Sequence, residues 1–179
     1  MERVVVTGPA GAGKSELARR LGDLLGLPVL HLDTLFWKPG WVPTPPEEWE
    51  ALQRRELAAD RWIADAQYDD VLPDWVRDAD TVVLVDASPL RCLWRLGRRR
   101  LNRAASTSTP SGTKPGAVHR ALLKFLRNQW VYRTKVRREL LGELSRARNG
   151  RRVVLVRRGS DAAAFLRGVD SPPAARGTV

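Results

Sequence analysis

The sequence is poor in sulfur-containing and metal-binding side chains. Its 179 residues include one cysteine and two histidines. A single cysteine, Cys92, cannot form an internal disulfide, and it excludes a zinc site built from several cysteines. The histidines, His31 and His119, give no metal-binding spacing. We expect His31 to be a hydrogen-bonded residue at a strand end and Cys92 to be structural.

Long hydrophobic runs are also absent. Residues 4–6 and 82–85 form the longest runs, far short of the roughly 20 residues that cross a bilayer. A strand-like run follows the first three residues directly, and this pattern is not that of a signal peptide. Hydrophobic residues make up 43% of the chain and charged residues 28%, which is typical of one globular domain. We expect a soluble, cytoplasmic domain that makes no membrane contact.

Acidic side chains are scarce in one part of the chain. The whole sequence has 31 Lys and Arg against 20 Asp and Glu, a net charge of +11. Residues 1–90 carry 9 basic and 16 acidic side chains, whereas residues 91–158 carry 20 basic and 2 acidic ones, a local net charge of +18. Such a segment attracts anions, whether nucleotide phosphates, nucleic acid or a membrane surface. Charge alone does not choose among them.

Strand-like and helical patterns alternate along the chain. Five short apolar runs predict strands at 4–7, 28–32, 62–64, 81–85 and 152–156. Helical patterns separate them, including a long basic stretch at about 118–147. This alternation predicts an α/β fold with one parallel sheet covered on both faces. The C-terminal ends of the strands then share one edge, where ligands bind.

Segments rich in proline, glycine and small polar residues interrupt this pattern. Residues 37–46 hold four prolines and a glycine, which predicts an irregular loop. Residues 104–117 are rich in Ala, Ser, Thr, Pro and Gly, which predicts a mobile loop. We expect one domain over residues 1–167 and a disordered tail over residues 168–179.

Residues 8–15 read Gly-Pro-Ala-Gly-Ala-Gly-Lys-Ser and match the phosphate-binding pattern G-x-x-x-x-G-K-[ST] in full. The glycines allow backbone N–H groups to surround a phosphate, and the following helix adds the positive end of its dipole. Lys14 is expected to reach the β- and γ-phosphates, and the Ser15 hydroxyl to bind Mg²⁺. The predicted nucleotide-binding residues are Gly8, Gly11, Ala12, Gly13, Lys14 and Ser15.

Three aspartates follow predicted strands and supply carboxylates at the same sheet edge. They are Asp33, Asp65 and Asp86. One is expected to hold Mg²⁺, and another to orient or deprotonate an acceptor hydroxyl. Asp86 has the hydrophobic-run-then-Asp form of a Walker B residue, whereas Asp65 ends a weaker run. The sequence leaves open which of these two serves the metal.

Five arginines precede the predicted mobile loop, at positions 95, 98, 99, 100 and 103. Arginines on a closing lid can replace the water around a transferring phosphoryl group. We therefore predict a lid over about residues 95–120, with Arg95, Arg99 and Arg103 as catalytic residues beside Lys14. The alternative is a solvated basic face of a helix.

Taken together, these motifs resemble the small P-loop kinases of the adenylate kinase-like group, and in particular the FlaR-like or DNA topology modulation protein subfamily. The likeness covers about residues 3–167 and rests on residues 8–15, 31–33 with 35–41, 62–65 with 68, and 93–95 with 98–100. It implies the three-layer nucleoside monophosphate kinase fold, with a five-stranded parallel sheet in the order 2-3-1-4-5 and an arginine-bearing lid. It also implies an acceptor-binding segment at about residues 33–60.

The resemblance assigns roles to several residues. In such kinases the position of Asp33 faces the acceptor, that of Asp65 lies near Mg²⁺ and the acceptor, and that of Arg158 lies near the adenine. The subfamily usually has Asp-Gly-Asn-Tyr where this chain has Asp65-Ala66-Gln67-Tyr68. Its lid usually carries acidic residues, whereas residues 104–117 contain none. These departures leave two alternatives open: the acceptor differs from that of relatives, or the lid binds a more anionic partner.

Aromatic residues gather around the proline-rich segment. They are Phe36, Trp37, Trp41 and Trp49. They either stack on a base or sugar of the acceptor or form a small satellite core beneath the loop.

The leading interpretation is an ATP- and Mg²⁺-dependent phosphotransferase that acts on a nucleotide-like or other small-molecule acceptor. The alternative is a nucleic-acid-directed P-loop protein, either a kinase of polynucleotide ends or a nucleotide-gated binder, supported by the basic segment 91–158. A regulatory nucleotide switch is a third interpretation. The sequence does not identify the acceptor, choose ATP over GTP or define the oligomeric state.

Overall fold

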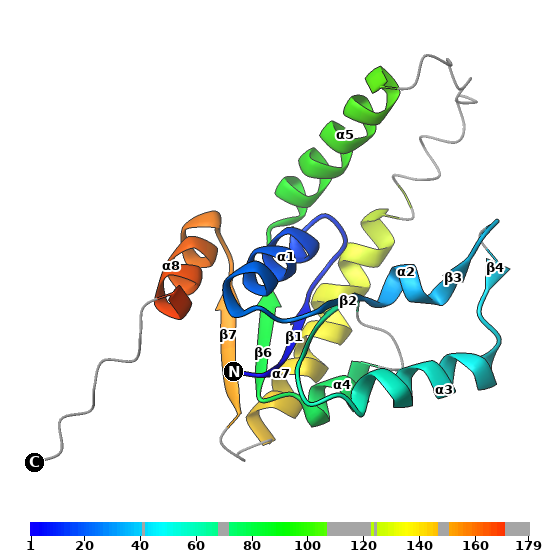
Figure 1. Cartoon of the computed structure of the whole chain (residues 1–179). Helices are drawn as coiled ribbons and strands as arrows, with labels where there is room; N and C mark the ends of the chain where they lie inside the picture. Colours follow the sequence, from blue (N-terminus) through cyan, green and yellow to red (C-terminus); the bar gives the residue numbers. More distant parts are fainter. Residues whose placement is uncertain (41, 68–71, 107–122, 124, 147–150, 171–179) are drawn as a thin grey trace, which may run out of the picture.

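The computed structural model describes residues 1–40, 42–67, 72–106, 123, 125–146 and 151–170 (Figure 1). The strands are β1 (Arg3–Thr7), β2 (Val29–His31), β3 (Trp37–Lys38), β4 (Val42–Pro43), β5 (Trp62–Ala66), β6 (Thr81–Val85) and β7 (Arg152–Val156). The helices are α1 (Lys14–Leu25), α2 (Leu32–Phe36), α3 (Pro46–Leu57), α4 (Leu72–Asp78), α5 (Pro89–Ser106), the π-helical turn η1 (Tyr132–Val136), α7 (Arg137–Arg146) and α8 (Gly159–Asp170).

Five parallel strands form the main sheet, in the order β2-β5-β1-β6-β7. Counted along the chain within this sheet, the order is 2-3-1-4-5, as predicted. Thr7, the last residue of β1, pairs with Ala66 of β5 and Leu84 of β6. The loop that follows β1 therefore emerges between the ends of its two neighbours, at the predicted ligand-binding edge.

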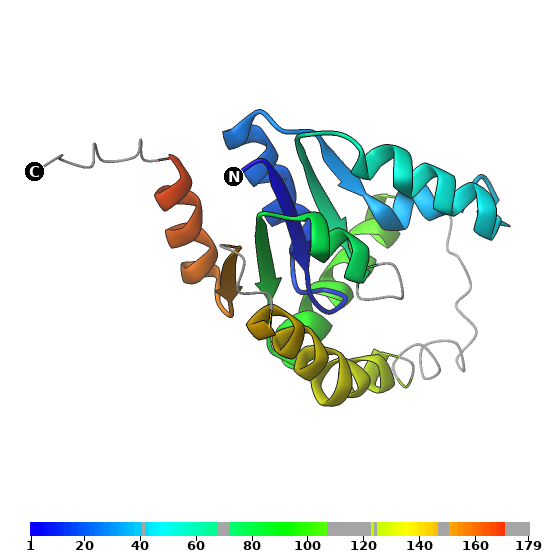
Figure 2. The same ribbon diagram turned by 90° about the horizontal axis from the view of Figure 1, so that it is seen from below.

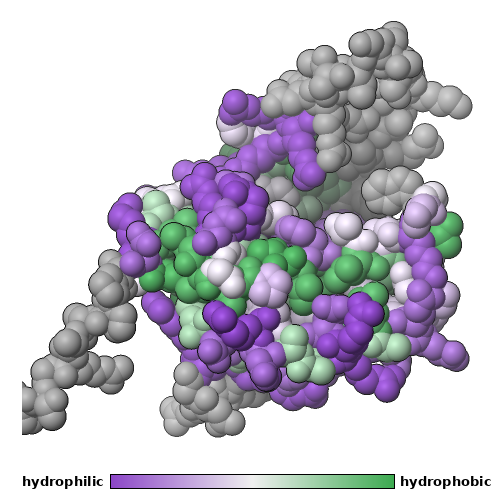
Figure 3. Space-filling view, viewed as in Figure 1, coloured by the Kyte–Doolittle hydropathy of each residue, from purple (hydrophilic) through white to green (hydrophobic). Residues whose placement is uncertain are grey.

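Side chains alternate between the two faces of the sheet and feed two cores. Val4 and Val6 of β1 pack with α1 and α8, whereas Val5 packs on the other face with α3, α4 and α7. Figures 1 and 2 show this three-layer arrangement. On the face seen in Figure 3, a hydrophobic band lies between hydrophilic regions. No helix in the described ranges is long and apolar enough to cross a membrane.

The predicted basic helix is present over the residues that can be described. Residues 125–131 are helical and continue without a break into η1 and α7; we call this combined segment the return helix. The sequence did not predict its π-helical turn, a feature frequent near functional sites. Residues 118–122, 124 and 147, also included in the predicted helix, lie outside the described residues.

The structure corrects the prediction for residues 37–46. In place of an irregular loop, strands β3 and β4 form an antiparallel hairpin in which Trp37 pairs with Pro43 and Lys38 with Val42. The hydroxyl of Thr44 donates to the carbonyl of Phe36 at 2.8 Å and closes the hairpin. Local pairing therefore overrides the high proline content, because a proline is tolerated in a strand wherever the ladder needs no donor from it.

Two predicted boundaries also shift. Helix α5 continues to Ser106, past the expected start of the mobile loop at residue 104, and α8 continues to Asp170, past the expected start of the tail at residue 168. The remainder of both predicted segments, residues 107–117 and 171–179, lies outside the described residues.

Candidate active site

The phosphate-binding motif forms the predicted strand–loop–helix unit between β1 and α1. Its glycines are required by close packing as well as by backbone conformation: Gly11 has φ of 80°. A Cβ at Gly11 would lie 2.7 Å from the Cys92 carbonyl oxygen, and one at Gly8 would collide with the Val85 carbonyl. The loop therefore rests directly against the end of β6 and the start of α5, where no side chain fits.

Three side chains bind the carbonyls of this loop. Lys14 Nζ donates to Pro9 O and Gln129 Nε2 donates to Ala10 O, each at 3.3 Å. Arg95 Nη1 donates to Ala12 O. Because each peptide unit is planar, these contacts fix the positions of the carbonyls of residues 9, 10 and 12 and of the amides bonded to them.

The Lys14 ammonium lies in the electrostatic reach of two predicted carboxylates. Burial lowers the pKa of Lys14, and the charges of Asp65 and Asp33 oppose that shift. The charges of Asp65 and Asp33, predicted to act on metal and acceptor, are therefore felt at the Lys14 ammonium. Ser15 occupies the exposed first turn of α1, next to this group.

Each of the two carboxylates near Lys14 has a partner that orients it. Asp65, buried at the end of β5, lies with Oδ2 2.8 Å from His31 Nδ1. This contact confirms the expected role of His31 as a hydrogen-bonded strand-end residue. Asp33 Oδ2 accepts a hydrogen bond from Gln67 Nε2 at 2.6 Å. The subfamily that the sequence resembles usually has asparagine at this position, and the longer side chain of Gln67 reaches Asp33.

Asp86 directly follows β6, as predicted, but its carboxylate is engaged elsewhere. Arg137 Nε donates to Asp86 Oδ2 at 2.9 Å, and the Asp86 side chain is 10% exposed. Burial raises the pKa of the neighbouring Tyr132, and the charge of Asp86 adds to the shift. No sequence pattern indicated the contact between Asp86 and Arg137, because 51 residues separate the two.

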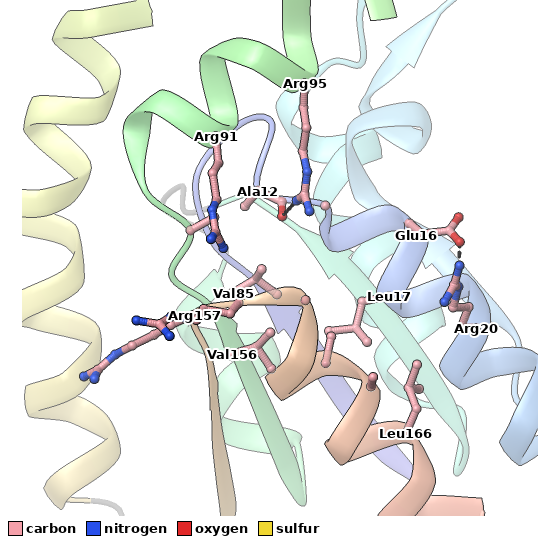
Figure 4. A pocket seen from close by; sticks show the side chains of 16 residues that line it. Ala12, Glu16, Leu17, Arg20, Val85, Arg91, Arg95, Val156, Arg157 and Leu166 are labelled. Atoms are coloured by element: carbon pink, nitrogen blue, oxygen red, sulfur yellow. Dashed lines mark hydrogen bonds and ion pairs between the residues drawn. The ribbon is translucent and has the colours of Figure 1, made fainter. Parts of the chain in front are cut away.

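A cavity of about 390 Å³ opens on one side of the loop, between α1, α5 and α8. Arg91 and Arg95 extend toward it from α5 (Figure 4). Asp161 Oδ2 accepts the backbone N–H groups of Arg157 and Arg158, each at 2.9 Å, and so shapes the turn after β7. Arg158 lines this cavity, and its nucleotide-binding role stays a prediction. Arg91 and Arg157 line it too, and Arg91 was not among the predicted residues.

Two further cavities share Gln67, and one of them reaches the phosphate-binding loop. One, of about 720 Å³, lies between α2 and the β3–β4 hairpin and includes Asp33; the second, of about 550 Å³, lies between loop residues 8–10 and the return helix. Gln67 lines both. The buried residue Gln129 also lines the second cavity, and no sequence pattern marked it as functional.

Not all predicted arginines join this site. Arg99 is exposed on α5 and lines none of these three cavities, and the side chain of Arg103 lies outside the described residues. Other cations of the basic segment make internal contacts: Arg151 Nε, for example, donates to Ala79 O at 2.9 Å. Part of the positive charge that suggested nucleic acid therefore supports the fold itself.

The aromatic cluster packs as the small satellite core that was one of its two interpretations, and stacking on an acceptor stays a prediction. Trp49 is buried and packs edge-on to Phe36, with ring centroids 5.4 Å apart. Phe36 in turn contacts Trp37, which is 42% exposed and lines the cavity that includes Asp33. Trp41 lies outside the described residues.

Comparisons with known proteins agree with this architecture. No protein-family model matches the chain. The shikimate kinase of Acinetobacter baumannii, solved in complex with shikimate, superposes with a TM-score of 0.57 at 14% identity, over 94% of this chain and 90% of that one. The shikimate kinase of Bacteroides thetaiotaomicron gives a TM-score of 0.50 at 14% identity, over 94% and 96% of the two chains.

A sequence relative matches over a shorter stretch. The cytidylate kinase of Nitratidesulfovibrio vulgaris (strain DP4) is 46% identical over 57 residues, which are 31% of this chain and 25% of that protein. The chain thus spans about a quarter of the length of the curated relatives it matches. The sheet order, the phosphate-binding loop and these neighbours together define the P-loop kinase fold.

Proposed function

We propose that the protein is a Mg²⁺- and ATP-dependent phosphotransferase that acts on a small-molecule acceptor. One observation carries the proposal: the phosphate-binding loop separates two kinds of cavity. Loop residues 12 and 13 line the cavity with the arginines of α5 and β7–α8, and residues 8–10 line a cavity on the acceptor side. An enzyme that moves a phosphoryl group between two molecules needs this arrangement, because both must meet at the same phosphate.

The nucleotide belongs on the side of α1, α5 and α8. Its phosphates would lie against the loop amides and Lys14, and its base between Arg91 and the turn after β7, where Arg158 lies. Arg95 holds the loop and lines the same cavity, so it can approach the transferring group. Arg99 and Arg103 remain predicted lid residues, whose action requires the lid to move.

Magnesium would be held by few protein groups. No cluster of three or more His, Cys, Asp or Glu side chains suited to a metal occurs among the residues described. Mg²⁺ bound with a nucleotide typically takes one or two protein oxygens and completes its shell with phosphate oxygens and waters. The Ser15 hydroxyl and the Asp65 carboxylate fit that need, and bound Mg²⁺ would neutralise charge on the phosphates. Because the Asp86 carboxylate is paired with Arg137, we favour Asp65 over Asp86 as the metal ligand.

The subfamily of the protein and the class of its acceptor are proposals. The likeness to the FlaR-like subfamily is supported by the sequence motifs, and the cytidylate kinase segment favours a kinase of small metabolites. The alternative, a nucleic-acid-directed protein, is supported by the charge of residues 91–158 alone.

The test is a transfer assay with γ-labelled ATP, Mg²⁺ and a metabolite extract to which short RNA and DNA are added. We expect label in small molecules. Lys14→Ala should abolish transfer, whereas Arg54→Ala, at an exposed site on α3, should leave it within twofold of wild type. Label in the oligonucleotides would favour the alternative. Label released as free phosphate at a trace rate, with none transferred, would contradict a kinase.

A further inference from the structure

The lining of the cavity that includes Asp33 indicates which class of acceptor would fit there. The cavity volume is about 720 Å³, ample for a small metabolite. Two hydrogen bonds hold its walls in place. The Thr44 hydroxyl donates to the Phe36 carbonyl, and Lys38 Nζ donates to Glu48 Oε2 of α3 at 2.6 Å. The described residues that line it are Asp33, Thr34, Trp37, Lys38, Pro39, Gly40 and Gln67.

The charges of this lining disfavour an anionic acceptor. Asp33 presents a carboxylate, and the single cation of the described lining, Lys38, is paired with Glu48. Kinase sites for phosphorylated compounds use arginines, whose fork matches a phosphate, yet no arginine occurs in the described lining. A phosphate dianion placed here would face the Asp33 carboxylate at close range, where like charges repel. Arg127 lines the other cavity that Gln67 borders, and not this one.

The apolar part of the lining suits a ring. Trp37 presents an exposed indole that is held from behind by Phe36, whose ring centroid lies 5.1 Å away at 82°. Phe36 is itself braced against the buried Trp49. A rigid indole face packs well against the C–H face of a sugar or a planar base, and costs little conformational entropy on binding.

We infer that the acceptor is an uncharged ring compound that bears a hydroxyl group, such as a sugar, a cyclitol or a nucleoside, and that it is not a phosphorylated compound. This inference rests on the proposed function. The acceptor hydroxyl oxygen forms a bond to the γ-phosphorus of ATP while the bond from that phosphorus to the β,γ-bridging oxygen breaks. The electron pair of the broken bond leaves with ADP, and the hydroxyl proton passes to the Asp33 carboxylate and then to water.

The decisive experiment separates neutral from anionic acceptors. A metabolite extract is passed over an anion exchanger, and the flow-through and the retained fraction are each incubated with enzyme, Mg²⁺ and γ-labelled ATP. Matched pairs are assayed beside them: cytidine with CMP, adenosine with AMP, and ribose with ribose 5-phosphate. We expect a labelled product from the flow-through, and at least a tenfold preference for the neutral member of any pair that reacts. A labelled product confined to the retained fraction, or a tenfold preference for a monophosphate, would overturn the inference.

Failure of the underlying function has a different signature, which is no label transfer from either fraction. Asp33→Asn supplies the residue-level test, with Asp60→Asn, exposed in the turn before β5, as the matched control. Asp33→Asn should lower kcat/KM for the acceptor at least 100-fold and change the Kd of MgATP less than threefold. A comparable loss of MgATP affinity would place Asp33 in the nucleotide site and contradict the assignment.

Discussion

At the scale of single residues, Lys14 holds a positive charge where little water reaches it. The side chain is 8% exposed, and burial lowers its pKa below the ordinary 10.5. Replacing a buried charge by a hydrophobic residue of similar length is often neutral or stabilising. The phosphate-binding function, in contrast, needs the charge. Stability and activity therefore make opposite demands on this position.

We predict that Lys14→Met abolishes phosphoryl transfer and raises the free energy of unfolding of the ligand-free protein by about 1 kcal/mol at pH 7. The destabilisation caused by the buried Lys14 ammonium is fully present at pH values below the lowered pKa of the folded protein. It disappears as the pH rises toward 10.5, where the lysine of the unfolded chain also loses its proton. The gap between variant and wild type should therefore narrow with rising pH. Urea denaturation at several pH values measures it, and a variant less stable than wild type at pH 7 would refute the argument.

At the scale of secondary structure elements, the return helix is fastened to the sheet edge at two points. Gln129 binds the phosphate-binding loop, and Arg137 binds Asp86 after β6. The π-helical turn η1 lies between the two contacts. Because a π turn shifts the next helical residues relative to a regular α-helix, it sets the register at which both contacts are made.

Gln129 donates a hydrogen bond to the Ala10 carbonyl of the phosphate-binding loop, so its loss should weaken nucleotide binding. We expect Gln129→Leu to raise the Kd of MgATP about fivefold, the equivalent of one hydrogen bond of about 1 kcal/mol. Calorimetric titration measures this change. Arg138→Ala, exposed on the same helix, is the control. Equal affinities of the Gln129 variant and the wild type would show that the loop does not depend on this contact.

Asp86 and Arg137 should behave as a coupled pair. Arg137→Met leaves a nearly buried carboxylate without its cation, and we expect it to lower the free energy of unfolding by about 2 kcal/mol. The double variant Asp86→Asn/Arg137→Met should lose at least about 1 kcal/mol less than the sum of the single variants. Denaturation of all four proteins completes the cycle. Additive losses would mean that the pair contributes no interaction energy.

At the scale of the whole molecule, local patterns predicted the fold and the phosphate-binding loop, whereas long-range contacts escaped prediction. The five strands were recognisable because each is a continuous apolar run that can be buried in a parallel sheet, and residues 8–15 carry their motif within eight positions. The hairpin at residues 37–43 was missed because prolines dominate the local signal. Gln129 and Arg137 were missed because each acts on a loop far away in the sequence, and no local pattern records such a contact.

The phosphate-binding loop touches β6, α5 and the return helix at once, so a ligand seated in it should stabilise the entire domain. MgATP at 100 times its Kd is expected to add about 2.7 kcal/mol to the free energy of unfolding. For a chain of this size that raises the Tm by about 5–10 °C in a thermal melt. Lys14→Met should show no such rise, and EDTA should reduce it in the wild type because the phosphates lose their counter-ion. A wild-type melt that MgATP leaves unmoved would show that the loop does not bind a nucleotide, and the proposed function would fall with it.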